Sequence, residues 1–534
     1  MSFNRIYQVI LLIGGVLCSA NLAAQQIDSS FLDINYVRKQ NAWISSKNAA
    51  GLKYFKWSKA SSADFFFDKS DGQFKNFHQS DNSYEYGLNA YSLYRLNPKM
   101  VFEGSISYHN FKGKNMGGSA FIDPYKNPFD IVERDDANKG TKVKETFSLN
   151  GALSAQLSSK FAVGGRINYQ AANFAKTKDL RHINKLLDME VSMGAVYRAS
   201  KVVEIGANYN YDRRIESILF KTYGNVDKPI SSLISFGSFY GMLETFGSDG
   251  YTRDSQTNPL VNTSQGFSFQ LNLYLSKKMS LLNEFTYGRP KGYFGEKGTI
   301  SFLLAEHEGE KYRYKGVISV LGDQNEHQIA FTASYNSLLN NDNSSKRETN
   351  PGGASSVSRL SKEVLDQQRL QAEISYIFFK DIKNLNPAWV FGVDMGYFRR
   401  QQTTKLYPFY RDQTINSYQV KTSVKRNIVK TDQLYSLALG VGYGAGSGLA
   451  KDDGFYIPPS GGTAPINMDM YLNQEFEYFT KPRAMAEASL QYTKKLKQHI
   501  APYVKLNYSF TKAFDTQALG SSFGVGGLSI GCNF

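Results

Sequence analysis

Alternation of apolar and polar residues with a period of two is the strongest pattern in the chain. In residues 433–444 small residues occupy one face, and the other face carries Tyr435, Leu437, Leu439, Val441 and Tyr443. The same alternation recurs at 202–211, 267–273, 389–397 and 502–510. A period of two is that of a β-strand with two different faces. Many of these segments exceed the roughly 5–6 residues of a soluble strand and match the roughly 9–11 of a tilted membrane strand, so they predict membrane-spanning strands.

Connections between the predicted strands alternate between short and long, as in barrels with short periplasmic turns and long extracellular loops. The short connections fall near 97–99, 158–160, 200–201, 276–278 and 495–497. The long connections cover roughly 112–142, 215–263, 338–365 and 446–480. With both termini in the periplasm and a first strand near residue 51, the count is 18 strands, with 16 as the alternative. Parts of 51–96 and residues 297–306 are interpreted as hairpins extending above the membrane.

Tyrosines lie near the ends of the apolar faces, where an aromatic belt is expected at each membrane interface. Those next to long loops are Tyr108, Tyr169, Tyr209, Tyr287, Tyr335, Tyr397, Tyr443 and Tyr508. Because each unpaired backbone group costs several kcal/mol in hydrocarbon, a spanning sheet must close on itself. The predicted fold is therefore all-β: a transmembrane antiparallel up-and-down β-barrel with a short N-terminal segment and long extracellular loops.

The first 24 residues have the layout of a secretory signal peptide. Arg5 precedes the apolar run 9–18, and Ala23 and Ala24 offer small residues for cleavage. We expect a signal peptide over 1–24, a periplasmic or lumenal segment over 25–50 and a barrel over 51–534. The expected location is the bacterial outer membrane. Cleavage removes Cys18, so the mature chain keeps only Cys532 and forms no intramolecular disulfide.

Composition is consistent with this picture. Mean hydropathy is −0.40 although aromatic residues make up 14% of the chain, as expected where one residue in two meets lipid. The formal net charge is +15. Export argues against nucleic acid as a partner, so we assign the excess Lys and Arg to the membrane rims beside anionic headgroups of the lipid bilayer.

The chain contains no recognised catalytic motif. There is no Gly-x-Ser-x-Gly elbow, no His-Glu-x-x-His and no phosphate-binding glycine loop. The six histidines are scattered, and Glu306-His307-Glu308 places neighbouring side chains on opposite faces of a strand. We therefore predict no enzyme activity, no metal site and no cofactor.

Charged residues on the inner face form the candidate functional set. Carboxylates facing lipid are costly, so those within the strands are expected to point into the lumen. The lumen-facing candidates are Glu85, Glu103, Arg166, Glu190, Glu204, Glu284, Glu373, Asp394, Glu487 and Lys505. They fit two interpretations: a generic polar lining, or a substrate pathway or polar lock around a plug.

Two segments are candidate plugs. Residues 25–50 are too few for a large globular plug but enough for a hatch in the lumen. The connection 215–263 is too apolar for a solvated loop, so it either plugs the lumen or contacts a partner. In the last strand, Phe523 and Val525 are out of phase with Leu528, which predicts a bulge at Gly526-Gly527 that turns Cys532 towards lipid.

The C-terminal residues 528–534 resemble the terminal signature of bacterial outer-membrane proteins. This resemblance implies recognition by the outer-membrane assembly machinery, with Phe534 as the insertion signal. The mature chain also resembles an uncharacterised Bacteroidota-type family of outer-membrane barrels, a domain of unknown function. The residues that suggest it are Asn41-Ala42-Trp43, Asn48-Ala49-Ala50-Gly51-Leu52, Asp123-Pro124 and Asp179-Leu180-Arg181.

Residues 48–52 also resemble the Asn-Pro-Ala segment of long-chain fatty-acid transport barrels, with Ala49 in place of proline. The predicted function is a channel or transporter for an unidentified solute. The alternative is a non-transport barrel that anchors or scaffolds a surface lipoprotein or another outer-membrane complex. A surface lipoprotein or an uptake-system component is the partner that these functions imply.

Overall fold

The structure is a computed structural model, and the part of the chain that it describes begins at Phe31. The predicted signal peptide over 1–24 and residues 25–30 lie outside it. The described residues are 31–134, 138–223, 229–248, 250–254, 256–296, 303–349, 355–459, 464–496 and 500–534.

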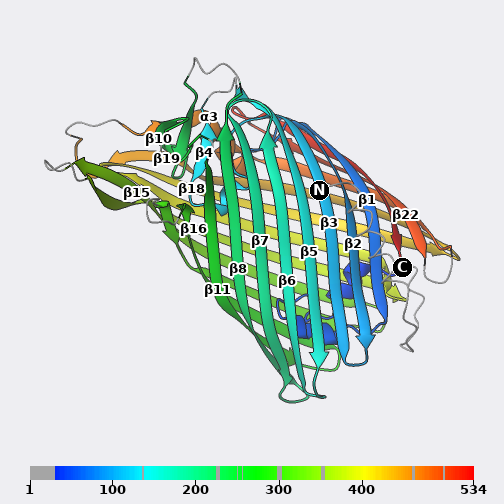
Figure 1. Cartoon of the computed structure of the whole chain (residues 1–534). Coiled ribbons are helices and arrows are strands. Elements are labelled where there is room, and N and C mark those ends of the chain that lie inside the picture. The colour runs from blue at the N-terminus through cyan, green and yellow to red at the C-terminus, as the bar shows by residue number, and fades with distance from the viewer. Residues whose placement is uncertain are drawn as a thin grey trace, which may run out of the picture.

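The chain forms a closed antiparallel β-barrel of 18 strands, as predicted (Figure 1). We name its two ends the turn end and the loop end, after the connections found there. Strands that run towards the loop end are β1 (Lys59–Gly72), β3 (Met100–Met116), β6 (Phe161–Lys176), β8 (Val203–Lys221), β12 (Met279–Gly295), β15 (Glu326–Thr349), β17 (Asn386–Leu406), β19 (Gln433–Phe455) and β22 (Ala501–Ala513). Strands that return are β2 (Asn82–Asn97), β5 (Gly140–Gln156), β7 (Arg181–Arg198), β11 (Thr257–Tyr274), β13 (Leu303–Glu308) with β14 (Lys311–Leu321), β16 (Ser355–Lys383), β18 (Phe409–Lys430), β21 (Arg483–Lys494) and β23 (Ser522–Asn533).

β13 and β14 count as one crossing because they are collinear. Glu308 pairs with Lys291 and Lys311 pairs with Gly288, so both segments share one register against β12. They also share one register against β15. Residues 303–306 therefore belong to a membrane-crossing strand and not to a separate hairpin, so the predicted count of 18 strands still holds. Residues 297–302 lie outside the described part of the chain.

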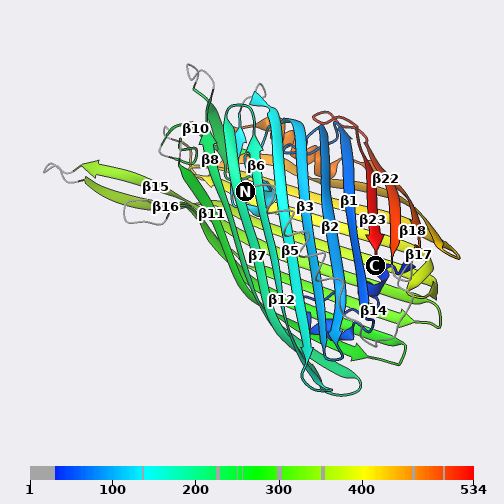
Figure 2. The ribbon, with the colours of Figure 1, turned by 45° about the vertical axis from the view of Figure 1, so that its right-hand side comes forward.

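The barrel closes between the last strand and the first, as predicted (Figure 2). β23 pairs antiparallel with β1, Ile530 lies opposite Phe65, and the Phe534 amide donates to the Ser61 carbonyl at 3.0 Å. Cys532 shares the outer face with Ile530, as predicted.

The predicted bulge at Gly526-Gly527 is wrong, since β23 keeps one register along both neighbours. Phe523 faces inward instead and packs against an apolar cluster that includes Phe74 and Leu519. An apolar side chain on the lumen face is stable there because loop residues cover it, so no change of face is needed.

Several strand ends differ from the prediction. The first strand begins at Lys59 and not near residue 51, because residues 49–54 form a 3-10 helix, η2 (Ala49–Tyr54). Most of the predicted loop 338–365 is a hairpin of β15 and β16, which projects beyond the neighbouring strands (Figures 1 and 2). The strand β19 likewise continues to Phe455. A hairpin in water needs no apolar face, so its polar sequence has the composition of a loop.

The outer surface carries the expected apolar band and aromatic belts. Tyr287, Tyr312 and Tyr335 lie in register on three neighbouring strands, with ring centroids 5.1 and 6.4 Å apart. Nearer the turn end, the Tyr435 and Tyr492 rings lie 5.2 Å apart. Among the described residues, no helix has the length and apolar character needed to cross a bilayer.

Two sets of elements fill the lumen. Near the turn end, residues 31–58 form the lumenal segment, which contains α2 (Ile34–Lys39) and η2 (Figure 1). At the loop end, inter-strand residues form a cap with η3 (Pro124–Lys126), α3 (Asp469–Thr480) and a four-stranded sheet. The strands of that sheet are β20 (Ile466–Asn467), β10 (Tyr240–Thr245), β9 (Ser231–Ser235) and β4 (Asp130–Glu133).

Candidate functional site

The lumenal segment is anchored to the wall by Glu204 of β8, whose side chain is fully buried. Its carboxylate accepts hydrogen bonds from the Trp43 indole at 3.0 Å and from the Tyr54 hydroxyl. From the wall, Arg198 donates at 2.7 Å and the Tyr274 hydroxyl at 3.0 Å. A buried carboxylate is stable only when its oxygens are paired in this way.

Asn48 holds η2 against the neighbouring strands. Its side-chain amide donates to the carbonyl oxygens of Ala195 and Ala207, at 2.9 and 3.2 Å, and to the Gln270 side chain at 3.0 Å. Its oxygen accepts from the Ala50 amide, which caps the 3-10 helix. The Asn48–Leu52 motif of the sequence therefore forms a docking element inside the barrel.

Glycines in the wall make room for this docking element. A Cβ atom at Gly164 would lie 2.3 Å from the Ala50 nitrogen, and one at Gly194 would lie 2.7 Å from the Asn48 side-chain oxygen. Gly164 and Gly194 are paired across β6 and β7. The pair forms a cradle that the backbone of η2 approaches closely.

Five of the ten predicted lumen residues bind the segment or support its binding. Glu190 pairs with the Lys47 ammonium at 3.2 Å, and Glu284 accepts from the Lys47 amide at 3.0 Å. Glu103 is buried, lies 3.9 Å from the Arg38 guanidinium, and is paired with Arg166 at 3.0 Å. Glu204, described above, completes the set.

The other five predicted residues share the inner-face parity of their strands but do not contact the segment. Glu85 pairs with His109 at 3.0 Å, Asp394 accepts from Ser375 at 2.6 Å, and Glu487 pairs with Lys421 at 2.5 Å. The side chain of Glu487 is 48% exposed, against 4% for Glu103. This set consists of Glu85, Glu373, Asp394, Glu487 and Lys505. The segment therefore leans on one side of the barrel, and the opposite side, mainly β16 to β23, faces open lumen apart from contacts of the segment with β16 and β18 at the turn end.

The inner face of β19 is built from very small residues at the centre of this open wall. Leu439 and Val441 point outward and are exposed on the lipid side. The alternate positions point inward, and they are Ser436, Ala438, Gly440, Gly442, Gly444 and Gly446. A Cβ atom added at Gly440 would meet its nearest neighbour at 3.4 Å, an ordinary contact. The wall therefore narrows the lumen little at Gly440, whereas nearer the loop end α3 lies against Gly446.

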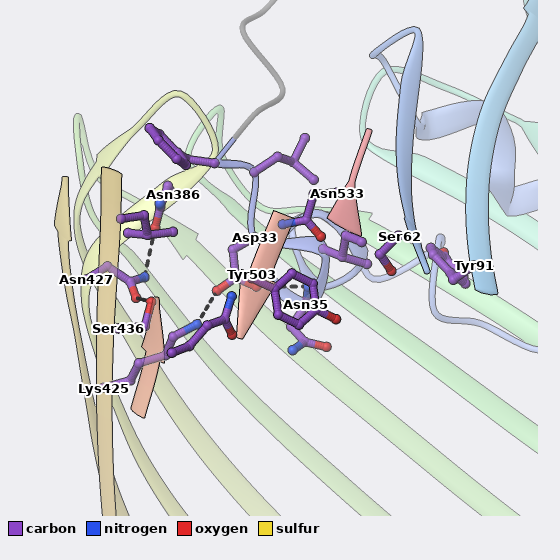
Figure 3. A pocket seen from close by; sticks show the side chains of 15 residues that line it. Asp33, Asn35, Ser62, Tyr91, Asn386, Lys425, Asn427, Ser436, Tyr503 and Asn533 are labelled. Atoms are coloured by element: carbon purple, nitrogen blue, oxygen red, sulfur yellow. Dashed lines mark hydrogen bonds and ion pairs between the residues drawn. The ribbon is translucent and has the colours of Figure 1, made fainter. Parts of the chain in front are cut away.

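A cavity of about 250 Å³ lies at the turn end of the open wall (Figure 3). Asp33 of the segment points across it to Lys425 of β18, with 2.8 Å between carboxylate and ammonium. Its other oxygen caps α2 by accepting from the Asn35 and Tyr36 amides. Burial raises the pKa of Asp33, but the Lys425 charge and these hydrogen bonds outweigh it, and the pKa is lowered overall. We call this ion pair the latch.

A second cavity, of about 570 Å³, lies at the loop end of the same wall, beside α3. Both cavities are lined by residues of β17, β18, β21, β22 and β23. Between them lie Lys421, Gly440 and Glu487, so the two cavities are the ends of one polar strip of wall.

The cap accounts for the apolar residues of the long connection 215–263. Ile234, Phe236 and Tyr251 are buried in one cluster with Phe129 and Phe294. Two contacts tie the cap to the wall: Arg400 of β17 pairs with Glu475 of α3 at 2.5 Å, and Arg411 of β18 donates to the Ser238 carbonyl at 3.1 Å. Of the two interpretations of this connection, the structure matches the inward-folded plug.

A sequence profile of a family of unknown function, DUF6850, matches residues 49–534. The chain belongs to this family. The resemblance to an uncharacterised family of outer-membrane barrels is thereby confirmed. No curated protein matches the chain.

Solved structures similar to the chain are outer-membrane receptors and an importer. The ferric preacinetobactin receptor BauA from Acinetobacter baumannii is 8% identical, with 89% of this chain and 80% of that chain covered and a TM-score of 0.37. The siderophore receptor PirA from the same organism is also 8% identical, with 89% of this chain and 80% of that chain covered and a TM-score of 0.39. The RagAB peptide importer is 8% identical, with 89% of this chain and 86% of that chain covered and a TM-score of 0.38. At this level the likeness implies nothing about substrate or mechanism.

Sequence reasoning missed the polar residues at the turn end of the open wall. Asn427 donates to Asn386 at 2.8 Å and accepts from Ser436 at 2.6 Å, which gives this rim a continuous polar row (Figure 3). The alternation of inward and outward side chains along the strand would have predicted that Lys425 and Asn427 face the lumen. Their proximity to Asp33 depends on where the lumenal segment leans, which no local pattern encodes.

The cap should loosen as the pH rises towards neutral. Burial raises the pKa of Asp130 in β4 to about 7, against the hydrogen bond from Ser119 and the charge of Lys142. Between about pH 4 and pH 7 the folded cap retains a proton that the unfolded state releases, so its stability falls over this window. Corrected for intrinsic rates, hydrogen exchange in 130–133 and 231–235 should be up to about a hundredfold faster at pH 8 than at pH 5. Asp130→Asn should largely remove this dependence, and an equal dependence in the variant would contradict the assignment.

Proposed function

We propose that this protein is a transporter of the bacterial outer membrane that moves a polar solute along the open wall between the two cavities. The observation that carries this proposal is that the same five strands line both cavities. We place the turn end of the barrel at the periplasm and the loop end at the cell exterior. Phe534 then lies at the periplasmic rim, where it serves as the insertion signal for the assembly machinery.

The composition of the open wall supports a pathway more than a generic lining. Charges of both signs are exposed along it: Lys421 and Glu487 pair with each other across β19, and Gly440 beneath them adds no side chain that would narrow the lumen. On the opposite side of the barrel, the inward-facing carboxylates bind the lumenal segment. A generic lining would not be divided in this way.

The lumenal segment acts as the periplasmic gate of this pathway. It closes the turn end through the latch between Asp33 and Lys425. Transport then requires the segment to leave its seat or to rearrange. Because the Lys425 side chain is 34% exposed, the latch is weaker than the fully buried anchor at Glu204.

The alternative role, scaffolding a surface lipoprotein, rests on the length of the four long connections and on the apolar connection 215–263. Its residues Leu233, Ile234 and Phe236 are fully buried in the cap. Burial in the cap explains these residues without a partner, whereas Met242 and Leu243 of the same connection are exposed.

Conductance of the purified full chain in planar bilayers tests the pathway. Asp33→Ala removes both the latch and the cap of α2, at a cost of about 1–2 kcal/mol. The open state should become about tenfold more populated. In that background Gly440→Trp should remove most of the added conductance, because an indole there fills the open wall.

Val441→Trp is the matched control, since Val441 is the next residue and points to lipid. It should leave the conductance of the Asp33→Ala protein unchanged. Equal conductance in the Gly440→Trp and Val441→Trp proteins would contradict a pathway along this wall.

A further inference from the structure

The cavity at the loop end has the features of a binding site, not merely of a passage. Phe74 and Gln79 from the β1–β2 loop and Tyr478 and Phe479 from α3 cover it, and the barrel wall closes its sides. Its volume of about 570 Å³ lies within the range of about 300–1,000 Å³ typical of small-molecule sites. It stands at the outer entrance of the pathway, where a transported molecule would first be held.

Aromatic rings form the apolar part of its surface. Phe398 of β17 and Phe479 are stacked, with centroids 5.3 Å apart, and Phe74 stacks with Tyr478 at 5.5 Å. Phe398 and Phe479 are only partly buried. Such rings present broad apolar surfaces to a flat, weakly polar molecular face.

Planar polar side chains form the rest of the surface. Gln371, Glu373 and Gln419 line the cavity, and none of them makes a side-chain hydrogen bond in the described part of the chain. Together they offer amide donors, amide acceptors and a carboxylate. Polar groups that point into a cavity without a partner are suited to binding the donors and acceptors of a ligand.

Charged groups of both signs line the cavity. The guanidinium groups of Arg369 and Arg483 keep their positive charge, although Arg369 donates to the Tyr125 carbonyl and Arg483 donates to the last carbonyls of α3 and to Ser417. An anion would face the free carboxylate of Glu373. A cation would face the two guanidinium groups.

We infer that this cavity binds a small neutral saccharide of one or two rings. Sugar hydroxyls both donate and accept, which matches Gln371, Glu373 and Gln419, and the C–H face of a sugar ring matches Phe398. The inference rests on the proposed transport function and names its class of substrate.

Titration calorimetry on the full chain tests this inference, in a detergent without a sugar headgroup. The probes are maltose, cellobiose and lactose, with alanyl-alanine and succinate as zwitterionic and anionic comparisons. At least one disaccharide should bind saturably. Phe398→Ala and Gln419→Ala should each weaken that binding about tenfold. Phe391→Ala changes a residue on the lipid side of the same strand and should not.

Three results would overturn the inference: no heat with any disaccharide, binding unchanged in Phe398→Ala, or tighter binding of alanyl-alanine or succinate. Saccharide binding alongside an unaffected Gly440→Trp conductance would reject the pathway and keep the binding site. A Gly440→Trp block without saccharide binding would reject the substrate class and keep the pathway.

Discussion

Replacing Gly164 with leucine will unseat the lumenal segment, and replacing its neighbour Gly165 will not. A Cβ atom at Gly164 would lie 2.3 Å from the nitrogen of Ala50 and 2.6 Å from the carbonyl carbon of Ala49. These are backbone atoms of η2, which cannot rotate away as a side chain can. Gly165 points outward, and its nearest neighbour would lie 3.8 Å from an added Cβ. The two substitutions add the same side chain to opposite faces of one strand.

We expect the Gly164→Leu clash to cost about 3 kcal/mol, which exposes the segment about a hundredfold more often. Trypsin reports this, because Lys47 and Lys53 lie in the seated segment and become cleavable when it leaves. Circular dichroism should show an intact barrel in both variants. Equal cleavage of the Gly164→Leu and Gly165→Leu proteins would mean that η2 is not seated against β6.

The crossings of the barrel could be read from the sequence because each lies between lipid and water. Because of that contrast, apolar and polar residues alternate with a period of two in every strand. This alternation was enough to predict where strands such as β3 and β22 begin. The first strand is the exception. Its predicted start lay in η2, where Leu52 and Phe55 are buried inside the lumen, and a local pattern does not tell that burial from contact with lipid.

The division of the inward charges could not be predicted. Lipid excludes carboxylates from the outer face, so parity is enough to predict that Glu190 and Glu487 point inward. Which of them binds the segment depends on contacts such as Lys47 with Glu190, which are 143 residues apart. The error at Gly526-Gly527 has the same origin, because Phe523 is covered by distant loop residues.

Removal of the Glu204 carboxylate should release the segment more completely than any other single loss of charge in the lumen. Glu204→Ala leaves four donors without their acceptor, two on the segment and two on the wall. Breaking a buried charged network of this kind costs about 3–5 kcal/mol. Glu204→Gln should fall between it and the native protein, because the amide oxygen still accepts two hydrogen bonds while the pairing with Arg198 is lost.

Trp43 provides the readout, since it is 1% exposed in its seat. With Trp57 and Trp389 replaced by phenylalanine, acrylamide quenching should rise in the order native, Glu204→Gln, Glu204→Ala. Glu487→Ala is the matched control, because it removes the same charge from the open wall, where the partner is Lys421. Its quenching should equal the native value. If Glu487→Ala exposed Trp43 as strongly as Glu204→Ala, the segment would be held by the total charge of the lumen and not by its local bonds, and the gate would respond to ionic strength.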